Sequence, residues 1–342
     1  MKKEIIIIVF VGLFVFSASG QNPLWDKNWE VVFQDDFSSP NINTNIWTVL
    51  DNFDHEEIQV HRSQNVYINN GKLVFETKKE NYCCPPAYVN DWACIRQWKT
   101  GECYKYTSGY VQSTEMYKYG YFEIYAKLPG DGAYWPAFWF WGSGVDETNN
   151  NCWYNEIDIF EVDGCVTDSI SNNHPFYFEC PPGAKHGQFA YFACNYANSY
   201  HWYGLEWDSD KITWYIDNNI VRQVANNMDG IGIQNPLRLT MNVALNDNAD
   251  CSLTANTVFP AYMYVDDANA YRLKCDKNTV VNEIYNYNTF NYAVKKSISL
   301  SGVSSLSFGQ NVSLRATDFI ELKAGFEVPL GAELYLGINS CE

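Results

Sequence analysis

The chain has 342 residues, a formal net charge of −17 and a sequence pI near 4.6. This acidic balance argues against nucleic acid and anionic membrane surfaces as partners, because both carry negative charge. The length suits one large domain and one small domain. Aromatic residues make up 17% of the chain; most should pack in the core, and the rest are candidates to stack on sugar rings.

The first residues have the pattern of a secretory signal peptide. Two lysines precede an apolar run over residues 5–16 and a small-residue stretch over residues 17–20. This order is typical of an export signal, here assigned to residues 1–20. The apolar run is shorter than the roughly 20 residues that a membrane-spanning helix needs. We therefore expect a secreted protein, extracellular or periplasmic, without a membrane partner.

Eleven cysteines in a chain with an export signal predict disulfide bonds. They fall into three groups: Cys83, Cys84, Cys94 and Cys103; Cys152, Cys165, Cys180 and Cys194; Cys251, Cys275 and Cys341. The spacing is not that of a zinc site and does not reveal the pairing. The odd number leaves one thiol unpaired or intermolecular. We expect the bridges to fasten long loops without taking part in chemistry.

Short runs rich in Val, Ile, Tyr, Phe and Trp predict an almost entirely β protein. Examples are Trp29–Phe33, Val66–Ile68, Lys72–Lys78, Gly120–Lys127, Tyr203–Trp207 and Lys211–Ile216. Residues 69–71 and 217–219 have the composition of hairpin turns. Many short antiparallel strands at regular spacing predict an all-β sandwich or jelly roll.

Three carboxylates are concentrated in the stretch Asn155–Glu161. Its alternation of apolar and acidic residues predicts a β-strand. On a regular strand Glu156 and Asp158 share one face, whereas Glu161 lies on the other. A β-bulge near Ile159–Phe160 would return Glu161 to the side of the other two.

Three carboxylates so close together repel one another, which raises at least one pKa. The result is an ionised nucleophile beside a protonated acid, the pair that a retaining glycosidase holds about 5 Å apart. An exposed acidic strand face and a calcium site are the alternatives. Upstream, residues 128–142 read LPGDGAYWPAFWFWG, whose aromatic side chains we divide between core and cleft. Trp153 lies three residues before Glu156 and should be close to the carboxylates.

Several further stretches follow in a fixed order along the chain: Trp29–Phe37, Tyr106–Gly109, Tyr119–Glu123, Trp135–Trp139, Glu156–Glu161, Trp202–Trp207 and Trp214–Asp217. In this order they resemble glycoside hydrolase family 16, which includes laminarinases, lichenases, agarases and κ-carrageenases. The resemblance covers residues 21–275. It implies a catalytic domain there, built as a curved antiparallel β-sandwich (jelly roll) with an open substrate cleft, and net retention of anomeric configuration.

The resemblance also implies roles for single residues. Glu156 matches the nucleophile, Glu161 the general acid/base, and Asp158 the carboxylate between them. The substrate-binding candidates are Trp135, Trp139, Trp153, His174 and Asn242. Catalysis should need no cofactor. A structural Ca²⁺ on the convex side is implied, held by Glu30, the Gly71 carbonyl and Asp266, because hard oxygen ligands suit this ion; ordinary surface acids are the alternative.

The substrate is read from weaker features. Residues 55–59 and 65–66 resemble laminarinase-type members, which favours β-1,3-glucan. Against this, residues 241–247 lack the Gly-Gly-x-Trp that laminarinases usually place there, and the Cys-rich insert over residues 82–103 is unlike a minimal laminarinase. The sequence predicts a monomeric, retaining endo-glycosidase acting on a polysaccharide, with endo-1,3-β-glucanase first. The alternatives are a β-agarase or κ-carrageenase-like galactanase, and a non-catalytic polysaccharide-binding protein on the same fold. A third class, an adhesin with a calcium site, is disfavoured because it would need neither the carboxylate motif nor the tryptophan-rich stretch.

The character of the chain changes after Cys275. An Asn- and Tyr-rich stretch over residues 278–291 leads into four short β runs: Ser297–Leu300, Val312–Arg315, Phe319–Leu322 and Glu333–Gly337. Residues 276–342 resemble the small C-terminal β modules appended to secreted enzymes of Bacteroidetes. Sugar binding, sorting and capping remain open for this module; a spacer or stabilising role ranks first.

Overall fold

The structure is a computed structural model. It describes residues 29–338 apart from residues 55–56, 89–92, 131, 147–150, 163–168, 180–181, 194–195, 198, 209–210, 227–232, 234, 247–252, 255, 274–277, 282–288, 292–294, 301–305, 307 and 310. The predicted signal peptide and seven of the eleven cysteines lie outside the part whose side chains are described. Within the described residues, no helix combines the length and apolarity needed to cross a membrane.

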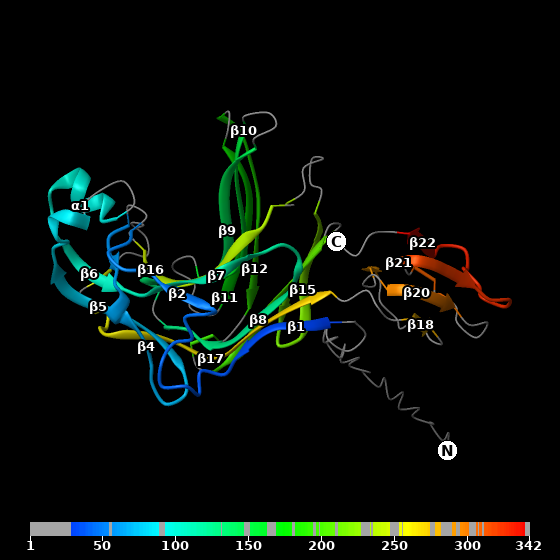
Figure 1. The fold of residues 1–342 in the computed structure, drawn as a ribbon, viewed down its shortest axis with the longest axis horizontal. Helices are drawn as coiled ribbons and strands as arrows, with labels where there is room; N and C mark the ends of the chain where they lie inside the picture. The colour runs from blue at the N-terminus through cyan, green and yellow to red at the C-terminus, as the bar shows by residue number, and fades with distance from the viewer. Residues whose placement is uncertain are drawn as a thin grey trace, which may run out of the picture.

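Two mainly antiparallel sheets form a sandwich, as the strand pattern predicts (Figure 1). The ten-stranded sheet runs in the order β15 (Asn219–Ala225), β14 (Lys211–Ile216), β13 (His201–Trp207), β8 (Gly120–Lys127), β17 (Ala261–Leu273), β5 (Leu73–Tyr82), β6 (Tyr104–Ser108) and β3 (Val60–His61), with β1 (Trp29–Asp35) on β17 and β4 (Val66–Ile68) on β5. The seven-stranded sheet runs β12 (Pro182–Ala193), β11 (Ser169–Glu179), β10 (Asn151–Glu161), β9 (Tyr134–Asp146), β16 (Leu237–Leu245), β7 (Tyr110–Tyr117) and β2 (Trp47–Val49).

The core lies between the facing sides of the two sheets. Successive side chains of a strand point to opposite faces, so one residue in two reaches it. On β8 these are Phe122, Ile124 and Ala126, and on β9 they are Phe138 and Phe140. The odd-numbered residues of β9 therefore point the other way, onto the outer face of the seven-stranded sheet.

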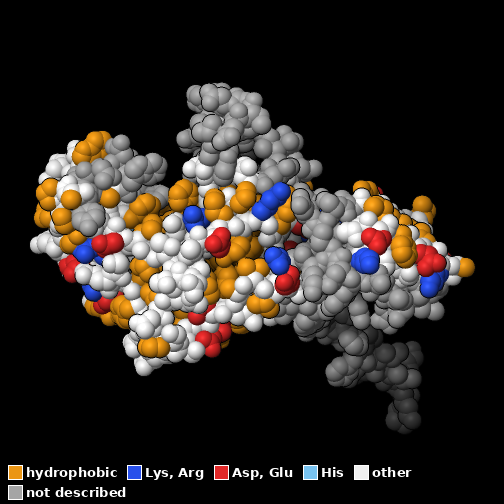
Figure 2. All heavy atoms as spheres, in the orientation of Figure 1, with side chains coloured by type: hydrophobic (Ala, Val, Ile, Leu, Met, Phe, Trp, Pro, Cys, Tyr) orange, Lys and Arg blue, Asp and Glu red, His pale blue; other side chains and the backbone are white. Residues whose placement is uncertain are grey.

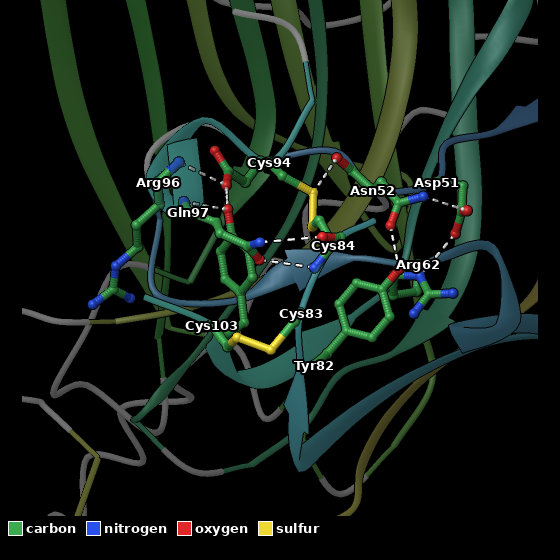
Figure 3. Close-up of a disulfide and its surroundings, with 12 residues drawn as sticks. Asp51, Asn52, Arg62, Tyr82, Cys83, Cys84, Cys94, Arg96, Gln97 and Cys103 are labelled. Atoms are coloured by element: carbon green, nitrogen blue, oxygen red, sulfur yellow. Dashed lines mark hydrogen bonds and ion pairs between the residues drawn. A yellow bond between two sulfur atoms is a disulfide. The ribbon is translucent and has the colours of Figure 1, made fainter. Parts of the chain in front are cut away.

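The Cys-rich insert contains two disulfides that the spacing could not assign (Figure 3). Cys83 bonds to Cys103, and Cys84 bonds to Cys94. The loop closed by Cys83 and Cys103 contains η2 (Pro86–Tyr88) and the one α-helix among the described residues, α1 (Ile95–Thr100). The Gln97 side chain accepts from the Cys84 backbone N–H at 2.8 Å and donates to its carbonyl oxygen at 3.1 Å. The insert is thus cross-linked internally, and the Cys83–Cys103 bond closes it where β5 ends and β6 begins.

A third sheet, with a core of its own, occupies the C-terminal part of the chain. Its strands are β18 (Asn278–Val281), β19 (Thr289–Asn291), β20 (Lys295–Leu300), β21 (Asn311–Leu322) and β22 (Glu333–Ile338). The predicted β runs fall within the last three. All of its strand pairs are parallel, and most partners are 22 residues apart, as with Ser297 opposite Phe319 and Asn311 opposite Glu333. Each turn of the chain therefore lays a new strand beside the previous one.

One ion pair links this C-terminal unit to the sandwich. Arg315 Nη2 lies 3.1 Å from Asp208 Oδ2, which follows β13 in the sandwich. The Arg315 side chain is 3% exposed, so this ion pair is largely shielded from water. Elsewhere the unit carries exposed apolar side chains, including Leu330 and Tyr335, and hydrophobic side chains are visible on its outer surface (Figure 2).

Candidate active site

The carboxylate stretch forms the end of β10, and the bulge predicted near Ile159 is present. The register with β9 runs Glu156 opposite Trp141 and Asp158 opposite Trp139, then shifts before Phe160 meets Phe138. Ile157, Ile159 and Phe160 are all buried in the sandwich core. Two consecutive inward residues reverse the alternation, which places Glu161 on the same face as Glu156 and Asp158.

Asp158 is the innermost of the three carboxyl groups. It is 1% exposed, and among the described residues no N–H or hydroxyl group donates to its carboxyl oxygens. Burial raises the pKa of Asp158 well above its usual range, and the negative charges of Glu161 and Glu156 raise it further. Asp158 therefore keeps its proton to higher pH than an ordinary aspartate. The protonated group can then donate a hydrogen bond to a neighbouring carboxylate.

Two tryptophans fix the ends of the carboxylate stretch. Trp135 on β9 donates from Nε1 to Glu161 Oε1 at 3.0 Å. Trp214 on β14 donates from Nε1 to the Asp158 backbone oxygen at 2.7 Å, from within the core. The second bond joins the two sheets directly beneath the carboxylates. Together the indole N–H groups hold the side chain of Glu161 and the backbone of Asp158 in place.

Aromatic residues continue this face across the neighbouring strands. Trp139 and Trp141 stack with their ring centroids 6.4 Å apart and their planes at 29°. Trp139 Nε1 donates to Asn242 Oδ1 on β16 at 2.8 Å, and both residues are almost buried. Tyr110 on β7 lies edge-on to Trp139 at 6.4 Å. The carboxylates therefore lie beside a wall of aromatic rings, in which the Trp139 indole N–H is paired with Asn242.

A second polar group, which the sequence did not single out as a site, lies beyond Tyr110. Gln59 donates to Glu57 Oε2 from Nε2, and His61 Nε2 lies 3.2 Å from the same oxygen. Gln59 Oε1 in turn accepts from the Leu245 backbone N–H at 3.0 Å, which ties this group to the end of β16. The alternation of polar residues in the stretch Glu57–His61 was the available signal.

Tyr110 connects the two polar groups. Burial raises the pKa of the Tyr110 hydroxyl, and the negative charges of Glu57 and Glu156 raise it further. Both carboxylates therefore lie within electrostatic range of one phenol. The carboxylate strand and the Glu57 group belong to one continuous surface.

The predicted substrate-binding residues are placed as follows. Trp135, Trp139 and Asn242 lie on the face that carries the carboxylates, on β9 and β16. Trp153 and His174 belong to β10 and β11, but their side chains lie outside the described part of the chain. Tyr110 and Trp141 share the face and were not predicted as site residues.

The calcium candidates are divided by the strand register. Gly71 precedes Lys72, whose Nζ forms an ion pair with Asp266, so these two candidates are neighbours. Glu30 on β1 lies opposite Arg272 and accepts from its guanidinium at 2.9 Å. Arg272 is six residues beyond Asp266 on β17, about 20 Å along the strand. The register therefore does not support Glu30 as a ligand of the same ion.

A different acid from the N-terminal segment, Asp36, acts on the neighbour of Asp266. Burial raises the pKa of Asp267, and the charges of Asp266 and Asp36 raise it further. Asp36, just after β1, therefore lies within electrostatic range of Asp267, the residue next to the calcium candidate Asp266. A calcium site in this region remains a prediction, and with Lys72 paired to Asp266 the described contacts already neutralise one of its acids.

The family follows from the sequence profile. Residues 53–257 match that of Glycosyl hydrolases family 16. This span contains the bulged carboxylate strand and the aromatic wall. The chain belongs to glycosyl hydrolase family 16.

Individual family 16 proteins are similar to this chain over different lengths. Glucan endo-1,3-beta-glucosidase A1 from Niallia circulans is 28% identical over 286 residues, covering 75% of this chain and 38% of that protein. Kappa-carrageenase from Pseudoalteromonas carrageenovora is 29% identical over 185 residues, covering 48% and 44%. The chain thus spans less than half the length of these two relatives. The catalytic domain of an endo-1,3-beta-glucanase (laminarinase) from Thermotoga petrophila RKU-1 superposes with a TM-score of 0.57 at 26% identity, covering 72% of this chain and 99% of that one.

A stability measurement tests the protonation of Asp158 in this family 16 site. A carboxyl group whose pKa is raised on folding binds its proton more tightly in the native state. Its contribution to stability is therefore full below the unfolded pKa of about 4 and is lost as pH rises towards the folded pKa, at about 1.4 kcal/mol for each unit of upward shift. Asp158→Asn removes the ionisable group. We expect this variant to gain stability over the wild type between pH 4 and pH 7.

Thermal unfolding at pH 4, 5.5 and 7 measures the difference. The control is Asp318→Asn. Asp318 is an exposed aspartate of the C-terminal unit and does not belong to β10 or its neighbouring strands. A wild type that becomes more stable than Asp158→Asn as pH rises would contradict a raised pKa.

Proposed function

We propose that this chain is a retaining endo-glycoside hydrolase that cleaves internal linkages of a β-glucan, and that its preferred linkage is β-1,3. The observation that carries the proposal is the bulged strand, which puts Glu156, Asp158 and Glu161 on one face beside the stacked Trp139 and Trp141. A binding protein on this fold would not need three mutually repelling carboxyl groups. Membership of family 16 supports the same reaction class.

In the proposed mechanism each step uses residues already in place. The Glu156 carboxylate attacks the anomeric carbon while the glycosidic C–O bond breaks and Glu161 gives its proton to the departing oxygen. Glu161, now a carboxylate, takes a proton from water, which displaces Glu156 from the sugar. The two displacements regenerate both groups and retain the anomeric configuration. The Trp135 indole holds Glu161 towards the leaving group, and a protonated Asp158 can donate to the nucleophile.

The β-1,3-glucan assignment rests on the relatives and on charge. Glucan endo-1,3-beta-glucosidase A1 and the laminarinase structure are named for this linkage. Recognition of sulfate groups usually employs arginine. Among the described residues near this face, Arg62 bonds to Asp51 at 3.0 Å and stacks on Tyr82, and Arg238 donates to backbone oxygens. A neutral polymer suits such a surface better than a sulfated one.

A galactanase is the second candidate, because kappa-carrageenase is among the relatives at 29% identity. Reducing-sugar assays with laminarin, lichenan, agarose and κ-carrageenan, followed by product analysis, separate the candidates. We expect short laminari-oligosaccharides from laminarin, with the β configuration in the first product. Neoagaro-oligosaccharides from agarose with laminarin untouched would overturn the glucanase proposal. The predicted signal peptide, and with it secretion, is tested by N-terminal sequencing of protein from the culture medium.

A further inference from the structure

A row of six aromatic residues crosses the outer face of the ten-stranded sheet, on the opposite side of the sandwich from the carboxylates. The row comprises Tyr67, Tyr125, Tyr200, Trp202, Tyr262 and Tyr264, from β4, β8, the segment before β13, β13 and β17. Their neighbours along the strands, such as Ile124, Met263 and Val265, are in the core. Strand alternation therefore directs the six outward. All six are partly exposed.

Five of the six rings lie close to one another, with interplanar angles of 25° to 37° between neighbours. Trp202 and Tyr125 are opposite each other in register and stack at 5.0 Å with planes at 25°. Tyr125 and Tyr200 are 5.3 Å apart at 37°. On β17, Tyr262 and Tyr264 stack at 5.7 Å and 26°. These contacts join the rings of neighbouring strands into one aromatic surface.

The rings on β8 and β17 belong to directly paired strands, and Tyr67 lies one strand further on, across β5. Tyr264 pairs with Val74, and Val74 pairs with Tyr67 on the other side. Val74 is 1% exposed although it faces away from the core residues Leu73 and Phe75. The row therefore continues from β13 to β4.

Polar groups are interspersed along this row. Lys72 Nζ lies 5.0 Å from the centroid of the Tyr200 ring and pairs with Asp266. Lys78 Nζ lies 3.1 Å from Glu76 Oε2, and the Tyr262 hydroxyl reaches Glu76 Oε1 at 3.5 Å. Both lysines are thus neutralised by carboxylates. Lys127, opposite Tyr264 in register, is a third lysine beside the row, and Asp267, opposite Tyr125, is a third acid, so positive charges do not outnumber negative ones.

Other tyrosines on the same sheet face show what a structural role looks like. Tyr121 is 1% exposed and Tyr215 3% exposed. Their hydroxyls donate to the buried acids Glu123 and Glu206, respectively, at 2.8 and 2.9 Å. These rings are enclosed and fully hydrogen-bonded. The six residues of the row on the same face are instead partly exposed, so packing alone does not account for them.

We propose that this row, which we call the outer aromatic row, is a non-catalytic binding surface for the polysaccharide that the carboxylate face hydrolyses. Pyranose rings carry apolar C–H faces with hydroxyls at the rim, which matches flat rings bordered by Glu76, Lys72 and Asp266. The lysines beside the row, Lys72, Lys78 and Lys127, do not outnumber its acids, Glu76, Asp266 and Asp267, and this balance favours a neutral polymer. The identity of the polymer rests on the proposed function.

Two sites on one rigid sandwich change how the enzyme meets a polymer. Binding at the outer aromatic row makes the next encounter with the same particle effectively intramolecular, which increases overall avidity. A short oligosaccharide cannot reach both faces, so its hydrolysis gains nothing from the row. Loss of the row should therefore weaken adsorption to insoluble polymer and leave hydrolysis of short soluble substrates unchanged.

The test measures adsorption isotherms of the full chain on insoluble β-1,3-glucan, with agarose beads in parallel, in a Glu156→Gln background that prevents digestion. Tyr262→Ala/Tyr264→Ala should bind the hydrolysed polymer about tenfold more weakly. Tyr262→Phe/Tyr264→Phe keeps the rings and should bind normally. Tyr335→Ala removes a tyrosine that is 61% exposed in the C-terminal unit and is the matched control. Trp202→Ala repeats the measurement at the other end of the row.

Each outcome decides one question. Hydrolysis of short oligosaccharides by the same variants, with Glu156 restored, should equal that of the wild type and shows that they are folded. Normal adsorption of both the β17 double variant and Trp202→Ala, or equal losses in Tyr335→Ala, would overturn the outer aromatic row as a binding surface. The proposed function is decided separately, by whether the wild-type chain hydrolyses either polymer at all.

Discussion

Glu156→Gln is expected to remove hydrolysis, lowering kcat/KM by at least about a thousandfold, because the double displacement loses its nucleophile. The amide has the size of the carboxyl group but cannot form the glycosyl ester. Glu156 is partly exposed at the sheet face, and its neighbours Ile157 and Asn155 carry the local packing. The chain should therefore remain folded, with a circular dichroism spectrum and melting temperature close to those of the wild type.

Glu115→Gln is the matched control for Glu156→Gln. Glu115 is an exposed glutamate on β7, a strand of the same sheet. Its replacement should leave the rate within about twofold of the wild type, as is usual for surface substitutions. Addition of a small anion such as azide to the truncated variant Glu156→Ala offers a further check, since the anion can occupy the space of the missing carboxylate and give a product of inverted configuration. Substantial residual activity in folded Glu156→Gln would assign the nucleophile elsewhere.

Phe160→Ala is expected to cost about 3–5 kcal/mol of unfolding free energy, the range for emptying a buried phenylalanine site. Phe160 is fully buried, with its ring centroid 4.5 Å from Tyr203 and 6.2 Å from Phe138. It points inward because the bulge makes two consecutive residues do so. The size of the loss, measured by denaturant unfolding, therefore tests the feature that positions Glu161.

Phe308→Ala serves as the comparison for Phe160→Ala. Phe308 is 83% exposed in the C-terminal unit, and its removal should change stability by no more than about 0.5 kcal/mol. If the two substitutions cost the same, Phe160 would not occupy the core and β10 would continue its regular alternation. Glu161 would then face away from Glu156, and the proposed acid/base pair would be lost.

Much of the fold was predictable because the alternation of apolar and polar residues that marks a strand is visible within a few consecutive residues. The bulge could be anticipated for the same reason: Ile159 and Phe160 are consecutive apolar residues between acidic ones, and only the inward face suits both. Trp135 and Trp139, from a stretch that matches the family, and Asn242, from one that departs from it, were named as candidates and lie on the carboxylate face. These residues are all placed by one strand or by its immediate neighbours.

What could not be predicted depends on partners distant in sequence. The Cys84–Cys94 bond is one of several pairings that the spacing allows. The bond between Gln59 and the Leu245 backbone joins residues 186 positions apart, and no local pattern announces it. Glu30 was assigned by motif position, whereas the register of β1 on β17 placed it opposite Arg272. Short β runs likewise do not reveal whether their neighbours run parallel.

The 22-residue offset between strands of the C-terminal unit has a consequence for how this chain can vary. Partners such as Thr289 and Asn311, or Leu314 and Leu336, repeat at the same interval. In a stack of this kind each layer touches only the layers next to it. Duplication of one 22-residue segment would lengthen the unit by about 4.8 Å, the spacing of adjacent strands, and leave the sandwich untouched. The length of the C-terminal unit can therefore change by whole repeats without altering the carboxylate strand.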